Sequence, residues 1–193
     1  YKKIRGEGKA MLAVTSIPNA IRYFYIIRDL YAKKCEEPEF RKYKDAPIAI
    51  VYSDDQRHES CATLNGGVSE EKVIQNFRQA KNGLIIVVDK LQTGFDEPKL
   101  HTLFLDKEIS GINAIQTISR VNRKYKDKEF GIVIDYLGIR EEMKKAMKKY
   151  GGDVTPKEDL AVAHEIFSNE LQIIKEMLVK LDYTPFFGNN NLA

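Results

Sequence analysis

The chain has 193 residues, of which 43% are hydrophobic and 31% charged, and 31 Lys and Arg against 28 Asp and Glu leave a net charge of +3. This composition is typical of a globular domain and excludes an intrinsically disordered chain. The sequence contains no apolar run of the roughly 18 residues that a transmembrane helix needs. Its two cysteines, Cys35 and Cys61, make no disulfide framework, which fits a reducing cytoplasm. Because the first residue is Tyr1 and not Met, we expect the chain to be part of a longer protein.

Five short apolar runs, rich in β-branched residues, predict strands that are buried on both faces of a parallel sheet. These runs lie at residues 10–14, 48–52, 84–88, 100–105 and 130–134. The segments between them have helical patterns. One follows Ile17 with Pro18 in its first turn, one extends from the N-cap Ser69 to about Asn82-Gly83, and one covers residues 112–123. Alternating strands and helices predict an α/β fold, an open parallel sheet with helices on both faces.

After Gly138 the pattern contains only helices. The stretch 140–150 is rich in Lys and Met. Thr155-Pro156-Lys157-Glu158 is a capping box that opens a helix with a broad apolar stripe, extending to about Leu181. We therefore divide the chain into an α/β domain at residues 1–139 and the start of a helical region at residues 140–193.

Polar residues follow the expected strands, and ligands of open parallel sheets bind outside the carboxyl ends of the strands. The segments concerned are 15–16, 53–55, 89–96, 106–111 and 135–138. The loop at residues 89–98 is the most distinctive. Gly94 permits close approach to its backbone, Thr93 offers a small hydroxyl, and Asp96 offers a carboxylate suited to a ribose hydroxyl. An ordinary Gly/Pro turn is the alternative interpretation of this loop.

Two arginines on the third expected helix form the second candidate site. Arg120 and Arg123 are three residues apart, so on a helix they project from one face, with Gln116 one turn earlier. Guanidinium groups placed together repel unless an anion lies between them, and their planar forks suit phosphate. The alternative is a solvated basic face. The sequence predicts no metal site, because His58 and Cys61 are the only close His/Cys pair.

Together, the two segments resemble a known family. Gly-x-Asp followed by Gln-x-x-x-Arg-x-x-Arg is similar to motifs V and VI of superfamily 2 helicases. More narrowly, four segments together resemble the motor (R) subunit of type I restriction enzymes, and these are residues 93–100, 103–107, 116–123 and 131–138. The resemblance covers residues 9–139 and implies the second RecA-like lobe of the motor.

The resemblance implies an ATP site shared between two lobes. Arg120 and Arg123 match the motif VI arginines, which reach the γ-phosphate across the cleft, and Gln116 matches the polar residue that begins the motif. Asp96 matches the motif V acid near the ribose, and Gly94 lies beside it in the same loop. ATP and Mg²⁺ would be held mainly by the first lobe. No Gly-x-x-x-x-Gly-Lys-Ser/Thr phosphate loop occurs in this chain, so we expect it not to hydrolyse ATP alone.

The resemblance also implies contacts with double-stranded DNA. Thr15 and Ser16 match motif IV, whose hydroxyl and amide donors bind phosphates, and Thr93 lines the cleft toward nucleic acid. Asn65, with Gly66, is a candidate for a backbone contact. The basic residues between 120 and 128 fit the same role, although the net charge alone does not indicate it.

The implied function is ATP-driven translocation of double-stranded DNA by the restriction subunit of a type I restriction endonuclease, with specificity and methyltransferase subunits as partners. Glu97-x-Lys99 and Glu70-x-Lys72 superficially match the Glu-x-Lys of restriction nucleases. Metal-dependent cleavage needs a further Asp at the same cation, so we place the nuclease outside this chain. Two alternatives stay open: a lobe of another superfamily 2 DNA helicase or repair ATPase, and a non-catalytic nucleic-acid-binding module.

Overall fold

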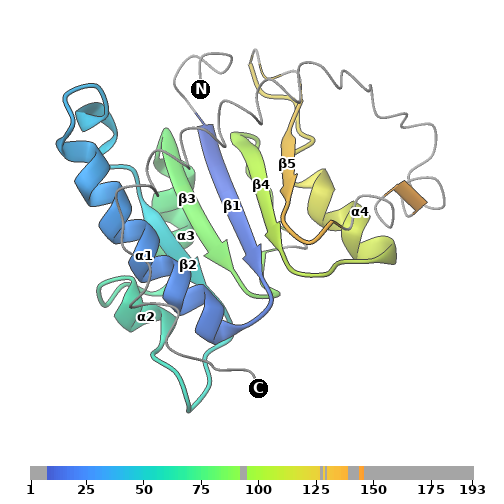
Figure 1. Cartoon of the computed structure of the whole chain (residues 1–193), viewed down its shortest axis with the longest axis horizontal. Coiled ribbons are helices and arrows are strands. Elements are labelled where there is room, and N and C mark those ends of the chain that lie inside the picture. Colours follow the sequence, from blue (N-terminus) through green and yellow to red (C-terminus); the bar gives the residue numbers. More distant parts are fainter. Residues whose placement is uncertain (1–7, 92–94, 127, 129, 139–143, 146–193) are drawn as a thin grey trace, which may run out of the picture. The chain divides into compact units, whose positions relative to one another are not determined.

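A computed structural model describes residues 8–91, 95–126, 128, 130–138 and 144–145. The chain divides into two compact units, 1–154 and 155–193, and all described residues belong to the first. Its centre is one parallel five-stranded sheet with the order β2-β3-β1-β4-β5 (Figure 1). The strands are β1 Gly8–Val14, β2 Ile48–Val51, β3 Asn82–Val87, β4 Leu100–Asp106 and β5 Ile132–Asp135.

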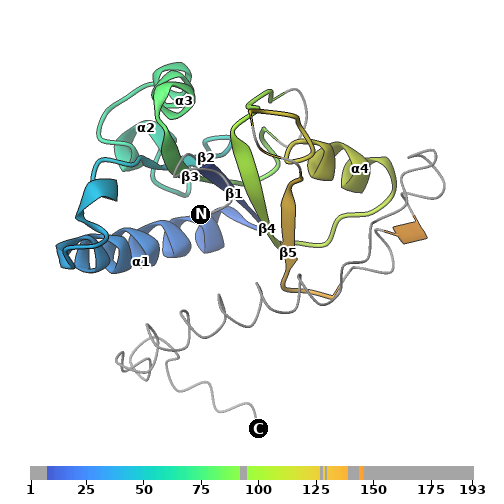
Figure 2. The ribbon, with the colours of Figure 1, turned by 90° about the horizontal axis from the view of Figure 1, so that it is seen from above.

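Helices lie on both faces of the sheet, as Figure 2 shows from above. The helix α1, Ile17–Glu36, covers one face, and α3, Glu70–Gln79, and α4, Gly111–Ser119, cover the other. A short helix, α2, Cys61–Leu64, lies beside the outer edge of β2, and a 3₁₀ turn at Arg41–Tyr43 follows α1. The predicted α/β class, an open parallel sheet between two helical layers, is confirmed.

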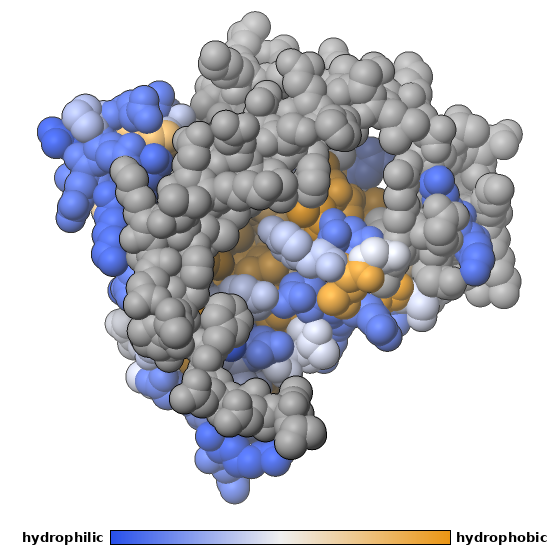
Figure 3. Space-filling model, in the orientation of Figure 1, coloured by the Kyte–Doolittle hydropathy of each residue, from blue (hydrophilic) through white to orange (hydrophobic). Residues whose placement is uncertain are grey.

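Successive side chains of the central strand β1 point to opposite faces of the sheet and so contribute to two apolar layers. Met11 and Ala13 of β1 contribute to a cluster under α3 and α4, whereas Leu12 and Val14 contribute to one under α1. Because both faces of β1 are covered, its side chains from Met11 to Val14 are almost wholly buried. In Figure 3 hydrophobic residues are visible near the middle of the face of the sheet that carries α1.

The predicted strands agree with the observed ones to within two residues at each end. The ends of two helices differ from the prediction. The helix α3 ends at Gln79 because Asn82 and Gly83 begin β3 instead of capping the helix, and the Asn82 Oδ1 accepts a hydrogen bond of 3.0 Å from the Gly8 N–H. The helix α4 ends at Ser119, four residues earlier than expected. The predicted helix opened by Thr155 lies outside the described residues, as does most of the stretch 140–150.

Candidate functional site

Arg120 connects the end of α4 to the loop that follows β3. It is the C-cap residue of α4, and its Nε donates to the carbonyl of Gln116 at 3.2 Å. Its Nη1 donates to the carbonyl of Phe95 at 3.0 Å. Phe95 is buried and its ring lies 6.3 Å from that of Phe77 in α3, so Arg120 holds the end of the loop on the apolar core.

Arg123 lies beyond the helix and faces the same loop. Its Nε is 3.8 Å from the Asp96 Oδ1, and the two side chains are 43% and 64% exposed. The prediction that Arg120 and Arg123 project from one face of a helix is therefore wrong, because α4 ends before both residues. They are brought together instead by their separate contacts with the adjacent residues Phe95 and Asp96.

The electrostatics of this arrangement favour an anion. Burial lowers the pKa of Arg120, the neighbouring Arg123 cation lowers it further, and the carboxylate of Asp96 raises it. Arginine remains protonated under these influences. Two guanidinium groups beside the exposed carboxylate of Asp96 carry more positive than negative charge, and their forks match the oxygens of phosphate.

Gln116 shares this end of α4 with the arginines. Its carbonyl accepts hydrogen bonds from the Ser119 hydroxyl at 2.7 Å and from Arg120, and its side chain is half-buried. The other predicted residues of the motif V loop, Thr93 and Gly94, lie outside the described residues.

The arginine group lies at the edge where the strands begin. Glu97, the residue after Asp96, pairs with Lys9 at the start of β1, whereas Thr15 directly follows the last residue of that strand. At about 3.3 Å per residue, these two ends of β1 are about 20 Å apart. Of the segments expected outside the carboxyl ends of the strands, the one at residues 89–96 therefore ends, at Asp96, near the opposite edge of the sheet.

Thr15 and Ser16 do lie at the carboxyl edge, and their hydroxyls differ in what they offer. The Thr15 Oγ1 donates to the carbonyl of Asp106 at 2.8 Å, so its proton is already engaged. Ser16 is the N-cap of α1, and its Oγ accepts from the Asn19 N–H at 3.4 Å. A hydroxyl that accepts keeps its own proton for donation, and phosphate oxygens need donors. Ser16 is therefore the better placed of the two to bind phosphate through its side chain.

Tyr23 is a polar residue at this edge that the sequence did not single out. Its hydroxyl donates to the Asp106 Oδ2 at 2.8 Å, next to the contact of Thr15. Burial and the nearby carboxylate raise the pKa of Tyr23 to about 12, so it remains a donor at neutral pH. Nothing in the spacing of α1 distinguishes Tyr23 from the aromatic residues that follow it.

Asn65 completes the edge strand β2. Its Oδ1 accepts from the Ile50 N–H at 3.2 Å, and its Nδ2 donates to the Ile50 carbonyl at 2.8 Å. Four residues earlier, the Cys61 sulfur makes the equivalent pair of contacts with the backbone of Tyr52. The side chain of Asn65 thus closes an otherwise open sheet edge, and the predicted DNA contact of this segment rests on its main chain.

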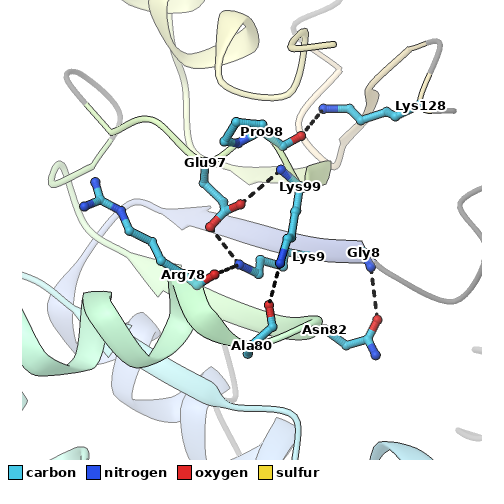
Figure 4. Close-up of polar contacts among 9 residues, drawn as sticks. All are labelled: Gly8, Lys9, Arg78, Ala80, Asn82, Glu97, Pro98, Lys99 and Lys128. Atoms are coloured by element: carbon cyan, nitrogen blue, oxygen red, sulfur yellow. Dashed lines mark hydrogen bonds and ion pairs between the residues drawn. The ribbon is translucent and has the colours of Figure 1, made fainter. Parts of the chain in front are cut away.

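Three buried charged residues surround the start of β4 (Figure 4). One of them, Lys128, belongs to the basic stretch that the sequence analysis expected to contact DNA, but its ammonium is buried against main-chain carbonyls. Lys9, Glu97 and Lys128 are all less than a tenth exposed. Lys9 lies one residue before the apolar run of its strand, which is the only sequence signal for its burial. Glu97 gives one oxygen to the Lys9 ammonium at 2.7 Å and the other to the Lys99 N–H at 3.0 Å, so this carboxylate is not arranged for the Glu-x-Lys nuclease alternative.

Neither a metal-binding cluster nor a membrane-spanning helix occurs among the described residues. In that part of the chain, no three His, Cys, Asp or Glu side chains are grouped so that they could hold a metal ion. None of its helices has the length and apolar character needed to cross a membrane.

Comparison with known proteins shows which proteins this chain is similar to. Residues 68–138, which include Asp96 and both arginines, match the family described as type I restriction enzyme subunit R domain 3. Over these residues the chain is similar to the R subunits of type I restriction enzymes. It is 29% identical, over 191 residues and 96% of its length, to the MjaIXP endonuclease subunit of a type I restriction enzyme from Methanocaldococcus jannaschii, and covers 16% of that protein. It is 40% identical over 70 residues, 35% of its length, to the type I restriction enzyme HindI endonuclease subunit of Haemophilus influenzae, of which it covers 7%.

The chain therefore spans about a sixth, or less, of the R-subunit relatives that it matches. Among solved structures, the C-terminal domain of the DEAD-box protein Dbp5 resembles it with a TM-score of 0.48 and 18% sequence identity, over 84% of this chain and 83% of that one.

Proposed function

We propose that this chain is a segment of an R subunit and forms the second lobe of an ATP-dependent motor that moves along double-stranded DNA. One observation carries this proposal. Arg120 and Arg123 contact the adjacent residues Phe95 and Asp96. Arg120 donates to the Phe95 carbonyl, and the Arg123 Nε is 3.8 Å from the Asp96 carboxylate. A cationic pair and a carboxylate in one exposed cluster suit the phosphates and the ribose of a nucleotide.

In this proposal the two arginines act on charge that develops during phosphoryl transfer. ATP would supply the phosphoryl group and Mg²⁺ would neutralise part of its charge, and the first lobe would hold most of both. Arginines that stabilise transferring phosphoryl charge contribute roughly 10³–10⁵ in rate. Arg120 is held by two main-chain carbonyls and is suited to fixed binding, while the more exposed Arg123 is free to exchange Asp96 for a phosphate.

The carboxyl edge of the sheet would contact DNA. Ser16 and the amides beside it provide donors for phosphate oxygens, with Thr15, Asn65 and Thr93 as further contacts. Phosphate contacts carry no sequence information. We therefore infer that a specificity subunit selects the target, that a methyltransferase subunit completes the complex, and that DNA cleavage belongs to another region of the R subunit.

The proposal is tested by Arg120→Ala and Arg123→Ala in the complete R subunit, with Arg41→Ala as the control. Arg41 lies in the exposed 3₁₀ turn after α1. We expect each site variant to lose at least about 10³-fold in DNA-stimulated ATPase rate, with DNA affinity within about threefold of the wild type, and the control to retain both. Normal ATPase with lost DNA binding would contradict the proposal and favour the non-catalytic binding module.

A further inference from the structure

Lys128 fastens the segment that follows α4 to the segment that follows Asp96. Its ammonium donates to the carbonyl of Leu100 at 2.7 Å and to that of Pro98 at 3.2 Å. These carbonyls lie two and four residues beyond Asp96, on the chain that carries this acid into β4. Lys128 itself lies five residues beyond Arg123. One side chain thus joins the two segments that present the opposed charges.

The segment that carries Arg123 is fixed at both of its ends. At one end Val121 is buried, and Gly131 packs so closely on it that a Cβ at Gly131 would lie 2.4 Å from the Val121 carbonyl oxygen. At the other end Lys128 closes a turn, with its N–H donating to the Tyr125 carbonyl at 2.9 Å. Arg123 lies between these two fixed points.

The segment that carries Asp96 is fixed equally firmly. Glu97 binds the Lys9 ammonium of β1, and Lys9 also donates to the carbonyl of Arg78 at 2.9 Å, at the end of α3 (Figure 4). The buried Lys9 side chain is 0% exposed. Asp96 therefore extends from a segment that an ion pair holds to the central strand on one side and that Lys128 holds on the other.

We propose that Lys128, together with Glu97 and Lys9, is a positioning residue that sets the distance between Asp96 and Arg123 in the nucleotide site. This inference rests on the function proposed above. Arg123 reaches a phosphate usefully only if its backbone is held at a fixed distance from the acid, and misplacement of a catalytic group by about 1 Å can cost about 100-fold in rate.

The chemistry of Lys128 supports a geometric role. Its ammonium is buried, and both of its hydrogen-bond acceptors are main-chain carbonyls, with Glu97 as the nearby opposite charge. Burial lowers the pKa of Lys128 to about 8, with Arg123 adding to that effect. Because burying a charge carries a large desolvation penalty, a buried lysine contributes little to stability compared with an apolar side chain of the same volume. Its benefit is that one flexible side chain holds two separate backbone segments together, its own and the one that leads into β4.

The test is a double-mutant cycle in the complete R subunit, with Lys128→Met and Arg123→Ala made singly and together. Lys81→Met is the matched control, because Lys81 is an exposed lysine at the same edge of the sheet. We expect Lys128→Met to lower kcat for ATP by about 10- to 100-fold, with KM changed by less than threefold, and Lys81→Met to change neither. In the Arg123→Ala background we expect Lys128→Met to change the single-turnover rate by less than twofold, because the residue it positions is gone.

Each other outcome overturns one of the two proposals. If Arg123→Ala leaves kcat unchanged, the proposed nucleotide site is wrong. If Arg123→Ala lowers kcat but Lys128→Met does not, or if Lys128→Met costs the same factor in both backgrounds, the positioning role is wrong and Lys128 is merely structural. Should Lys128→Met fail to fold, Glu97→Gln, which keeps the shape of its side chain, goes through the same cycle with the same criteria.

Discussion

The ion pair between Lys9 and Glu97 allows a quantitative test of the structure. Its nitrogen and oxygen are 2.7 Å apart, and the two side chains are 0% and 5% exposed. Lys9→Met would leave the Glu97 carboxylate buried without its cation, and breaking a buried pair in this way costs about 3–5 kcal/mol. In a chain of this length each kcal/mol shifts Tm by about 2–4 °C. We therefore expect Tm to fall by about 6–20 °C.

The double variant separates the interaction between the two residues from the effect of replacing each one alone. Replacing both residues, as Lys9→Met with Glu97→Leu, removes the stranded charge as well as the attraction, so its cost should be smaller than the sum of the single costs by about 2–3 kcal/mol. Thermal unfolding of the chain, followed by far-UV circular dichroism, measures all four species.

A second ion pair in the same chain is the control. Lys34 and Glu37 are 2.8 Å apart, almost the same distance, but their side chains are 28% and 48% exposed. Exposed pairs contribute about 0.2–1 kcal/mol, so Lys34→Met with Glu37→Leu should be nearly additive. If the buried pair shows no more coupling than the exposed one, Lys9 and Glu97 are not a buried ion pair, and the anchoring of the Asp96 segment is wrong.

Two further predictions concern other buried positions. Gly131→Ala should lower the stability of the chain by about 1–3 kcal/mol, because a Cβ there would lie 2.4 Å from the Val121 carbonyl oxygen; an unchanged or raised Tm in the same assay would refute this close packing. Burial raises the pKa of Cys61 to about 11, so at pH 8 its alkylation by iodoacetamide should be about 100-fold slower in the folded chain than in urea. Peptide mass spectrometry measures this rate, and similar rates in the two states would contradict the burial.

The sequence predicted the sheet well because its strands are simple. Buried parallel strands are continuous apolar runs, and the five runs were recognised without knowledge of their neighbours. The ends of helices were harder to predict. Asn82 and Gly83 are typical of a helix C-terminus, but their backbone pairs with β1 instead, and this depends on a strand more than 70 residues away. The short helix α2 has only four residues, too few for a periodic pattern.

The candidate site was predicted in its parts but not in its geometry. Arg120, Arg123 and Asp96 were identified by motif, and the structure brings them together. Their assembly depends on Arg120 binding the Phe95 carbonyl, a contact across 25 residues that no local pattern indicates. The anchoring residue Lys128 looked like one more cation in a basic stretch. Its burial follows only from the position of the Pro98 and Leu100 carbonyls, which is a property of the folded chain.

The two edges of the sheet define how this lobe would work as part of a motor. The segment proposed to bind nucleotide is anchored to the start of β1 through Lys9, and Thr15 and Ser16 directly follow the end of that strand. β1 is the middle strand, paired with β3 on one side and β4 on the other along nearly its whole length. A close-packed interior of this kind transmits a displacement and does not absorb it. Under the proposed function, therefore, movement of the arginines toward ATP would carry the DNA-facing edge with it, and the step would be a rigid displacement of the lobe.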